Sequence, residues 1–392
     1  MNDKIKELEK QLAELSKSEA VSTRRIDLLT QLGLEIGFND IERAYRLGKE
    51  ANVLSEKLNY GKGRAYSLLL FGIYEYYHTD YEKSLSLAHE ALELFQKQGD
   101  KAGEAHVLNG FGFVHWGLGD YEKALHFMHE SLRIFEDLGD KERESWTMTS
   151  LGGVYKDIGD HDQSLYYHFK SLDVFKQMND KLGEGRALSG IGTVYESMRE
   201  YKLALDNHFE CLQIFRDVGH RLSEARALND IGSVYQAQGK LEEALEHHLE
   251  SLEIRRELSN RPAETTSLIN LGRLFNQKKE GEKALSYLKE ALSLTEAHGA
   301  KPKIYQTHQA LSDAHELIGD FQSALFHQRE YERVKQEVFS EETNTKVKNL
   351  QLGFEIEKKE KEAEIYRLKN VELANTLKQL KQAQAKLIQT EK

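Results

Sequence analysis

The sequence predicts an all-α protein built from stacked helical hairpins, and three observations lead to this fold class. A glycine recurs every 40 residues, a small residue recurs with the same period at a second phase, and turn residues separate the two. Self-similarity at a fixed period is the signature of repeat architectures, in which each unit buries its apolar face against its neighbours. We therefore expect a solenoid of helix-turn-helix repeats.

Two periodic columns of small residues define the repeat. The glycine column consists of Gly72, Gly112, Gly152, Gly192, Gly232 and Gly272, with Ser312 continuing the series. The second column holds serine or alanine: Ser84, Ala124, Ser164, Ala204, Ala244, Ala284 and Ala324. Small side chains let two helices approach closely, so we expect the glycine on the first helix of each hairpin and the Ser/Ala on the second.

Turn residues mark both ends of these helices. Glycine followed by aspartate or lysine separates the two columns at Gly119-Asp120, Gly159-Asp160, Gly239-Lys240 and Gly319-Asp320, where glycine suits a helix C-terminus. The chain's two prolines, Pro262 and Pro302, share one repeat phase. We expect each to lie where a first helix begins, which is the helical position that tolerates proline.

Composition and charge narrow the function classes. The chain is 39% hydrophobic and 30% charged, as expected of a soluble protein with a continuous core. It has no apolar run near the roughly 20 residues that span a bilayer, and its amino terminus has no apolar signal core, so we expect a cytoplasmic protein. The net charge of −11 argues against nucleic acid as the main partner. The single cysteine, Cys211, shares a column with Ser131, Ser171 and Ser251, which indicates a packing role.

The chain divides into four segments by pattern. Residues 1–20 form a predicted charged helix, residues 23–60 a divergent capping repeat, and residues 62–340 seven repeats. Residues 341–392 are rich in Lys, Glu and Gln and predict one long helix with a break in its heptad register. Its apolar seam consists of Leu373, Leu377, Leu380 and Leu387. Such a seam predicts a parallel coiled-coil dimer, with an antiparallel or intramolecular partner and a solvated single helix as the alternatives.

The repeat is similar to the tetratricopeptide repeat. The resemblance rests on Leu-Gly-x-x-Tyr, then Gly-Asp-Tyr-x-x-Ala-Leu, as in Leu151-Gly152-x-x-Tyr155 and Gly119-Asp120-Tyr121-Glu122-Lys123-Ala124-Leu125. The 40-residue period departs from the usual 34 and resembles the Leu-Gly-Asn repeats of polarity adaptors and the large bacterial signalling versions. This resemblance implies a right-handed superhelix that binds extended or helical peptides on its inner face.

The tail carries a second resemblance. The stretch from Arg367 to Lys392 is similar to the coiled linker that precedes the phosphoacceptor helix in soluble bacterial sensor histidine kinases with tetratricopeptide inputs. The resemblance implies the sensory half of a larger signalling protein, with a kinase or a nucleotide cyclase as the output. A standalone scaffold or co-chaperone, with the tail as a fixed oligomerisation stalk, is the alternative.

The family geometry also predicts which residues line the inner face. They stand six and three positions before the signature glycine, and one and four positions after it. The candidate peptide-binding residues are Tyr66, Tyr76, His106, Asn109, Phe113, Trp116, Trp146, Arg186, Arg226, Asn229 and Arg273. Aromatic and arginine side chains are frequent interface anchors, the asparagines suit a peptide backbone, and the arginines suit an acidic side chain or a terminal carboxylate. The alternative is that the aromatic residues pack between hairpins or against the amino-terminal helix.

The sequence favours a binding protein over an enzyme. It contains no phosphate loop, dinucleotide fingerprint, nucleophile elbow or zinc-protease motif. The periodic histidines His168, His208 and His248 lie a full repeat apart, too far to share one metal ion, so we expect them to pack between the helices of each hairpin. We expect no cofactor and no metal.

Overall fold

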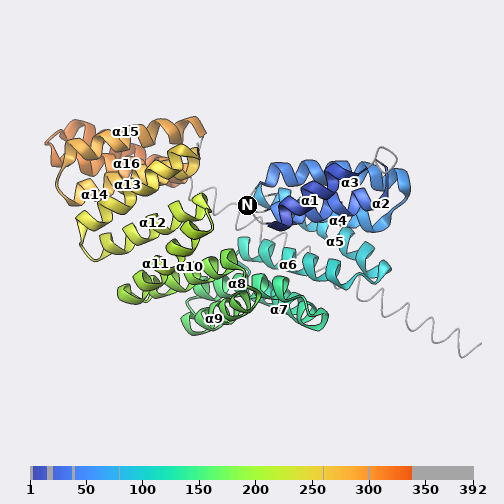
Figure 1. Cartoon of the computed structure of the whole chain (residues 1–392). Coiled ribbons are helices and arrows are strands. Elements are labelled where there is room, and N and C mark those ends of the chain that lie inside the picture. The colour runs from blue at the N-terminus through green and yellow to red at the C-terminus, as the bar shows by residue number, and fades with distance from the viewer. Residues whose placement is uncertain are drawn as a thin grey trace, which may run out of the picture. The chain divides into compact units, whose positions relative to one another are not determined.

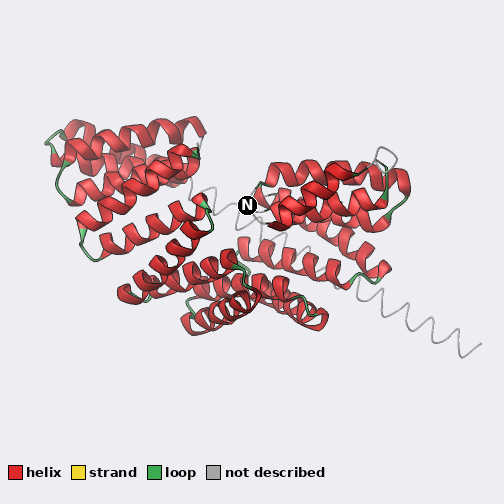
Figure 2. Cartoon of the chain, in the orientation of Figure 1, coloured by secondary structure: helices red, strands yellow, loops and turns green. Residues whose placement is uncertain are grey.

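The computed structural model describes residues 3–15, 21–37, 40–78, 80–258, 260–298 and 301–337. Figure 2 shows that these residues form helices joined by short loops, and none of them is in a strand. The helices labelled in Figure 1 are α1 (Asp3–Glu14), α2 (Thr23–Ile36), α3 (Ile41–Leu58), α4 (Gly61–Tyr77), α5 (Tyr81–Gln98), α6 (Lys101–Gly117), α7 (Tyr121–Leu138), α8 (Lys141–Ile158), α9 (His161–Met178), α10 (Lys181–Ser197), α11 (Tyr201–Asp217), α12 (Arg221–Ala237), α13 (Leu241–Glu257), α14 (Arg261–Gln277), α15 (Gly281–His298) and α16 (Lys301–Leu317). A further helix covers residues 321–337.

The helices pack as consecutive hairpins, which confirms the predicted solenoid. Each even-numbered helix from α2 to α14 packs most extensively on the helix that follows it. First helices also contact one another across neighbouring hairpins, as α4 does with both α2 and α6, and α12 with both α10 and α14. Second helices make no comparable contacts with one another among the described helices. The first helices therefore lie on the inner side of the curve.

Glycine and aspartate end and begin these helices, as the turn signals predict. Gly119 and Gly159 follow their helices with φ of 77° and 89°, a conformation that glycine adopts without a steric penalty. The next residue caps the following helix: the Asp120 carboxylate accepts a hydrogen bond from the backbone N–H of Lys123 at 3.2 Å. Pro262 lies in the first turn of α14, at the predicted kind of position.

Glycine is required in the first helix because a large side chain of the second helix fills the space where a Cβ would lie. A Cβ on Gly152 would lie 2.7 Å from the His168 ring, and a Cβ on Gly232 would lie 2.8 Å from the His248 ring. In other hairpins the same place is taken by Met128 beside Gly112 and by Leu288 beside Gly272. The predicted packing of the periodic histidines between the two helices is confirmed.

The Ser/Ala column and Cys211 also lie at close helix contacts. Ser84 Oγ donates to the carbonyl of Gly72 at 2.8 Å, and Ser164 Oγ donates to the carbonyl of Gly152 at 2.7 Å. Cys211 is fully buried and its Sγ lies 3.2 Å from the carbonyl of His208, and burial raises the pKa of its thiol to about 12. This is the inert packing cysteine that the sequence predicts.

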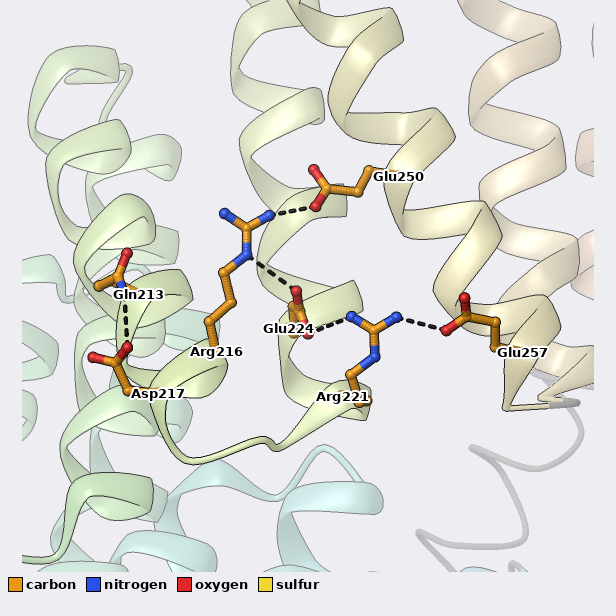
Figure 3. A network of polar contacts seen from close by, with 7 residues as sticks. All are labelled: Gln213, Arg216, Asp217, Arg221, Glu224, Glu250 and Glu257. Atoms are coloured by element: carbon orange, nitrogen blue, oxygen red, sulfur yellow. Dashed lines mark hydrogen bonds and ion pairs between the residues drawn. The ribbon is translucent and has the colours of Figure 1, made fainter.

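Five first helices have a buried glutamate in their first turn, a feature that the sequence patterns did not predict, and two of these glutamates, Glu224 and Glu264, also pair with an arginine of the preceding hairpin. Each has a Lys or Arg three residues before it: Glu104, Glu144, Glu184, Glu224 and Glu264. Figure 3 shows the arrangement at Glu224, which accepts from Arg216 Nε of the preceding helix at 3.0 Å and from Arg221 Nη1 at 2.9 Å. Arg216 and Arg221 reach on to Glu250 and Glu257 of α13. Salt bridges thus link three consecutive helices.

Candidate binding surface

An aromatic row runs across the inner helices of the amino-terminal half. The ring of Phe113 on α6 lies 6.1 Å from Tyr76 on α4 and 6.2 Å from Trp116, measured between centroids. The indole ring of Trp116 packs against α8 at Gly153. A Cβ on Gly153 would lie 2.7 Å from that ring. The indole N–H donates to Asp157 Oδ2 at 2.9 Å. The structure therefore brings three of the predicted aromatic residues together on one half-buried surface.

The aromatic residues six positions before the glycine have a different environment. Tyr66, His106 and Trp146 each pack edge-on against a buried phenylalanine of their own hairpin, with centroids 4.7, 5.3 and 5.2 Å apart. Those phenylalanines are Phe95, Phe135 and Phe175. Burial lowers the pKa of His106 to about 3, with further lowering by Arg143 and Lys4. These three rings are half-buried at the edge of the core.

Arginines follow the aromatic row along the inner helices. The Arg186 guanidinium lies over the Trp146 ring, 5.0 Å from its centroid, which is cation–π geometry. Burial lowers the pKa of Arg186, and the positive charge of Arg226 lowers it further. Arg226 itself is exposed. The two positive charges act on each other, which makes this part of the surface favourable for an anion.

The two predicted asparagines differ in the hydrogen bonds that their side-chain oxygens accept. Asn229 is buried, and its Oδ1 accepts from Asn270 Nδ2 at 2.9 Å. Asn109 is half-buried, and its Oδ1 has no hydrogen-bond partner among the described residues. That oxygen is itself buried, so neither asparagine presents a free side-chain carbonyl on the surface.

At the carboxy-terminal end the inner columns enclose a cleft of about 600 Å³. Arg273 is the one predicted site residue that lines it. The other lining side chains from the same columns are Gln236, Asn276, Gln309, Asp313 and Glu316. Burial raises the pKa of Asp313, as does the neighbouring Glu316, whereas Arg273 lowers it. The cleft offers both charges and several amides, which suits a polar peptide segment.

A buried polar cluster around Arg255 of α13 was not predicted from the sequence. Arg255 is 6% exposed and donates to the carbonyl of Ala263 at 2.8 Å and to Ser267 Oγ at 2.9 Å. Arg255 occupies the position that holds phenylalanine in four earlier repeats. The replacement of phenylalanine by arginine in this periodic column is the sequence signal that could have identified it. The nearby Asp230 has its pKa raised by burial, while the charges of His208, Arg226 and Arg255 lower it.

Two further expectations were that the chain needs no metal site and that it does not cross a membrane. Within residues 3–337, apart from the short gaps, no group of three or more His, Cys, Asp or Glu side chains is arranged to hold a metal ion. No described helix has the length and apolarity required to cross a membrane.

A family model for the tetratricopeptide repeat matches five overlapping stretches of the sequence. They are residues 63–137, 104–177, 143–217, 183–257 and 223–297. Together these matches cover more than half of the chain. The chain belongs to the tetratricopeptide repeat family.

Solved structures of other tetratricopeptide repeat proteins have the same fold. A Rap protein complexed with Competence and Sporulation Factor is 17% identical, with a TM-score of 0.60, over 86% of this chain and 92% of that one. A signal transduction ATPase with a tetratricopeptide repeat sensor, from Pyrococcus horikoshii, is 17% identical, with a TM-score of 0.65, over 87% of this chain and 55% of that one. The apo quorum sensor NprR from B. thuringiensis is 12% identical, with a TM-score of 0.51, over 81% and 100%. No curated protein matches the sequence significantly.

For this tetratricopeptide repeat protein, the inner surface of the first helices is thus the candidate peptide-binding surface. Tetratricopeptide folds are typically non-enzymatic scaffolds for protein binding. The predicted dimerisation residues Leu373, Leu377, Leu380 and Leu387 lie outside the described residues.

Proposed function

We propose that this chain is a non-catalytic sensory module of the cytoplasm that binds a protein or peptide on its inner surface. The observation that carries the proposal is the order in which aromatic, basic and polar side chains follow one another along that surface. An aromatic row of Tyr76, Phe113 and Trp116 precedes the arginines Arg186 and Arg226, and the polar cleft around Arg273 follows. Aromatic residues and arginine dominate binding energy at interfaces.

This order of side chains favours a particular ligand chemistry. An apolar segment of the ligand would pack on the aromatic row, and an acidic side chain or a terminal carboxylate would pair with the arginines. The complex of a Rap protein of the same fold with a sporulation factor supports a peptide as the ligand.

Signalling to a partner is the second part of the proposal. Residues 341–392 would form a dimeric coiled coil through the leucine seam and pass the binding event to an output domain such as a histidine kinase. A reading frame that continues past Lys392 into a kinase or cyclase would support this, and one that ends there would favour the standalone scaffold.

The test of groove binding uses selection and a charge reversal. Dodecapeptides selected from a random library against the full chain are measured by quenching of Trp116 and Trp146, the only tryptophans. Arg186→Glu with Arg226→Glu should weaken binding at least tenfold, since an attractive pair becomes a repulsive one. The matched control is Arg133→Glu with Arg329→Glu, which reverses two exposed arginines on second helices. Equal affinity of both variants, with normal helicity, would remove the arginines from the binding surface.

A further inference from the structure

The amino-terminal helix α1 reaches a first helix far away in the sequence. Lys4 Nζ lies 2.8 Å from Glu35 Oε1 on α2 and 2.8 Å from Glu142 Oε2 on α8. Arg143, next to Glu142, pairs with the same Glu35. Two positive and two negative side chains thus connect the capping hairpin with the third repeat, and we call these four residues the ion-pair latch.

Apart from the latch, α1 is held by an apolar face and by an ion pair between its Glu9 and Arg43 of α3. Its buried side chains are Ile5 and Leu8, which are 9% and 5% exposed. They belong to one cluster with three side chains of α2, and Leu12 of α1 packs against that cluster. The α2 side chains are Leu28, Leu32 and Ile36, and Ala44 of α3 and Leu70 of α4 belong to the same cluster. The other described residues of α1 are half-buried or exposed. The helix is therefore amphipathic, with its apolar face against the capping hairpin and α4 and its first turn paired with α8.

The position of α1 bears on the inner surface directly. The charge of Lys4 contributes to lowering the pKa of His106, which places the start of α1 beside the column six positions before the signature glycine. Glu142 and Arg143 belong to the first turn of α8, the helix that also carries Trp146. The start of α1 thus lies beside the first turn of α8, next to the amino-terminal part of the inner surface.

We propose that the seat of α1, formed by Glu35 and Glu142 together with Leu28, Leu32 and Ile36, is an exchangeable docking site for an amphipathic helix. The partner is a helical segment of another protein with Lys or Arg in its first turn, and with aliphatic side chains one and four positions later. This spacing reproduces Lys4, Ile5 and Leu8 on one helix face. The site lies apart from Arg226 and Arg273, so it goes beyond the proposed groove ligand.

Charge and burial both support exchange. The carboxylate of Glu35 is 5% exposed and pairs with both Lys4 and Arg143, so a partner residue that takes the place of Lys4 restores the second of these two cations. Lys4 and Glu142 remain 36% and 28% exposed, so water and salt can screen their attraction and α1 can leave. A competing helix of the same pattern would therefore make the same ion pairs and apolar contacts that α1 makes.

The experiment uses the full chain and a fluorescein-labelled synthetic peptide of residues 1–15 as the probe. Ile5→Gln with Leu8→Gln should release α1 and vacate its seat, so that the probe binds at least tenfold more tightly than it binds the unmodified chain. Lys6→Gln with Lys10→Gln, two exposed positions of the same helix, is the control and should leave probe binding unchanged. A probe that carries Glu in place of Lys4 should lose at least tenfold in affinity.

A second measurement distinguishes release of α1 from misfolding of the variant. In Lys4→Glu, hydrogen exchange of the amides of residues 7–14 should accelerate at least tenfold, while those of α2 and α8 stay protected. Retained protection of α1, equal probe binding by the unmodified chain and the Ile5/Leu8 variant, or loss of cooperative unfolding in that variant would each overturn the proposal. The last outcome would make α1 an integral part of the capping hairpin. None of these results involves a groove ligand, so the proposed function would stand or fall separately.

Discussion

The buried histidines of α9 and α13 should make the repeat array sensitive to mildly acidic pH. His168 and His248 are 4% and 0% exposed, and both ring nitrogens of His248 and Nδ1 of His168 have no hydrogen-bond partner among the described residues. Burial lowers the pKa of each from 6.5 to about 4, with further lowering by Lys156 at His168 and by Arg255 and His247 at His248. Because the folded pKa is depressed, the unfolded chain binds more protons, and stability falls as pH drops below 6.5.

The size of the effect follows from these pKa values. Between pH 8 and pH 5, a histidine with a pKa of about 4 in the folded state and 6.5 in the unfolded state costs about 2 kcal/mol of unfolding free energy. The two residues together cost about 4 kcal/mol, a large fraction of the stability of a typical domain. His168→Leu with His248→Leu should remove this part of the loss, since Leu288 already fills the equivalent space beside Gly272.

The assay is urea unfolding at pH 8 and pH 5, followed by circular dichroism at 222 nm. The unmodified chain should lose about 4 kcal/mol more than the double leucine variant over this pH range. His126→Leu, a change at an exposed histidine on α7, is the control and should leave the pH dependence as it was. An equal loss in the unmodified chain and the double leucine variant would refute the claim that buried imidazoles couple folding to pH.

Four further variants test the packing and the tail. Gly232→Ala should destabilise the chain by about 1–3 kcal/mol, because its Cβ would lie 2.8 Å from an imidazole, whereas Gly110→Ala has no atom within 4 Å and should gain about 0.5–1 kcal/mol from its helical preference. Thermal unfolding measures both, and equal effects would contradict the close contact. Glu264→Gln should cost about 1–3 kcal/mol in urea unfolding, because a 2% exposed carboxylate loses its charge between two arginines, and an unchanged midpoint would make the pairing energetically neutral. Leu377→Asp with Leu380→Asp should yield monomers in light scattering if the predicted seam forms the dimer, and a persistent dimer would count against it.

The predicted binding residues show how far a repeat pattern reaches. Spacing from the signature glycine placed Tyr76, Phe113 and Trp116 on one surface, and the structure brings them together. The same spacing did not reveal that Trp146 packs on Phe175, because that contact depends on the directions of two side chains within one hairpin. Nor did it identify Arg255, whose partners lie on the next helix.

The sequence by itself determined the helices, their ends and the pairing of the small columns. These features depend on groups a few residues apart, such as a glycine with positive φ and the aspartate cap that follows it. Only the tertiary structure decided which residues meet across repeats: Trp116 with Asp157, Arg186 with Trp146, and Lys4 with Glu142, 138 positions later. The physical reason is that each hairpin rotates slightly relative to the previous one. The sum of those rotations, set by side-chain packing at every interface, brings α1 to the start of α8.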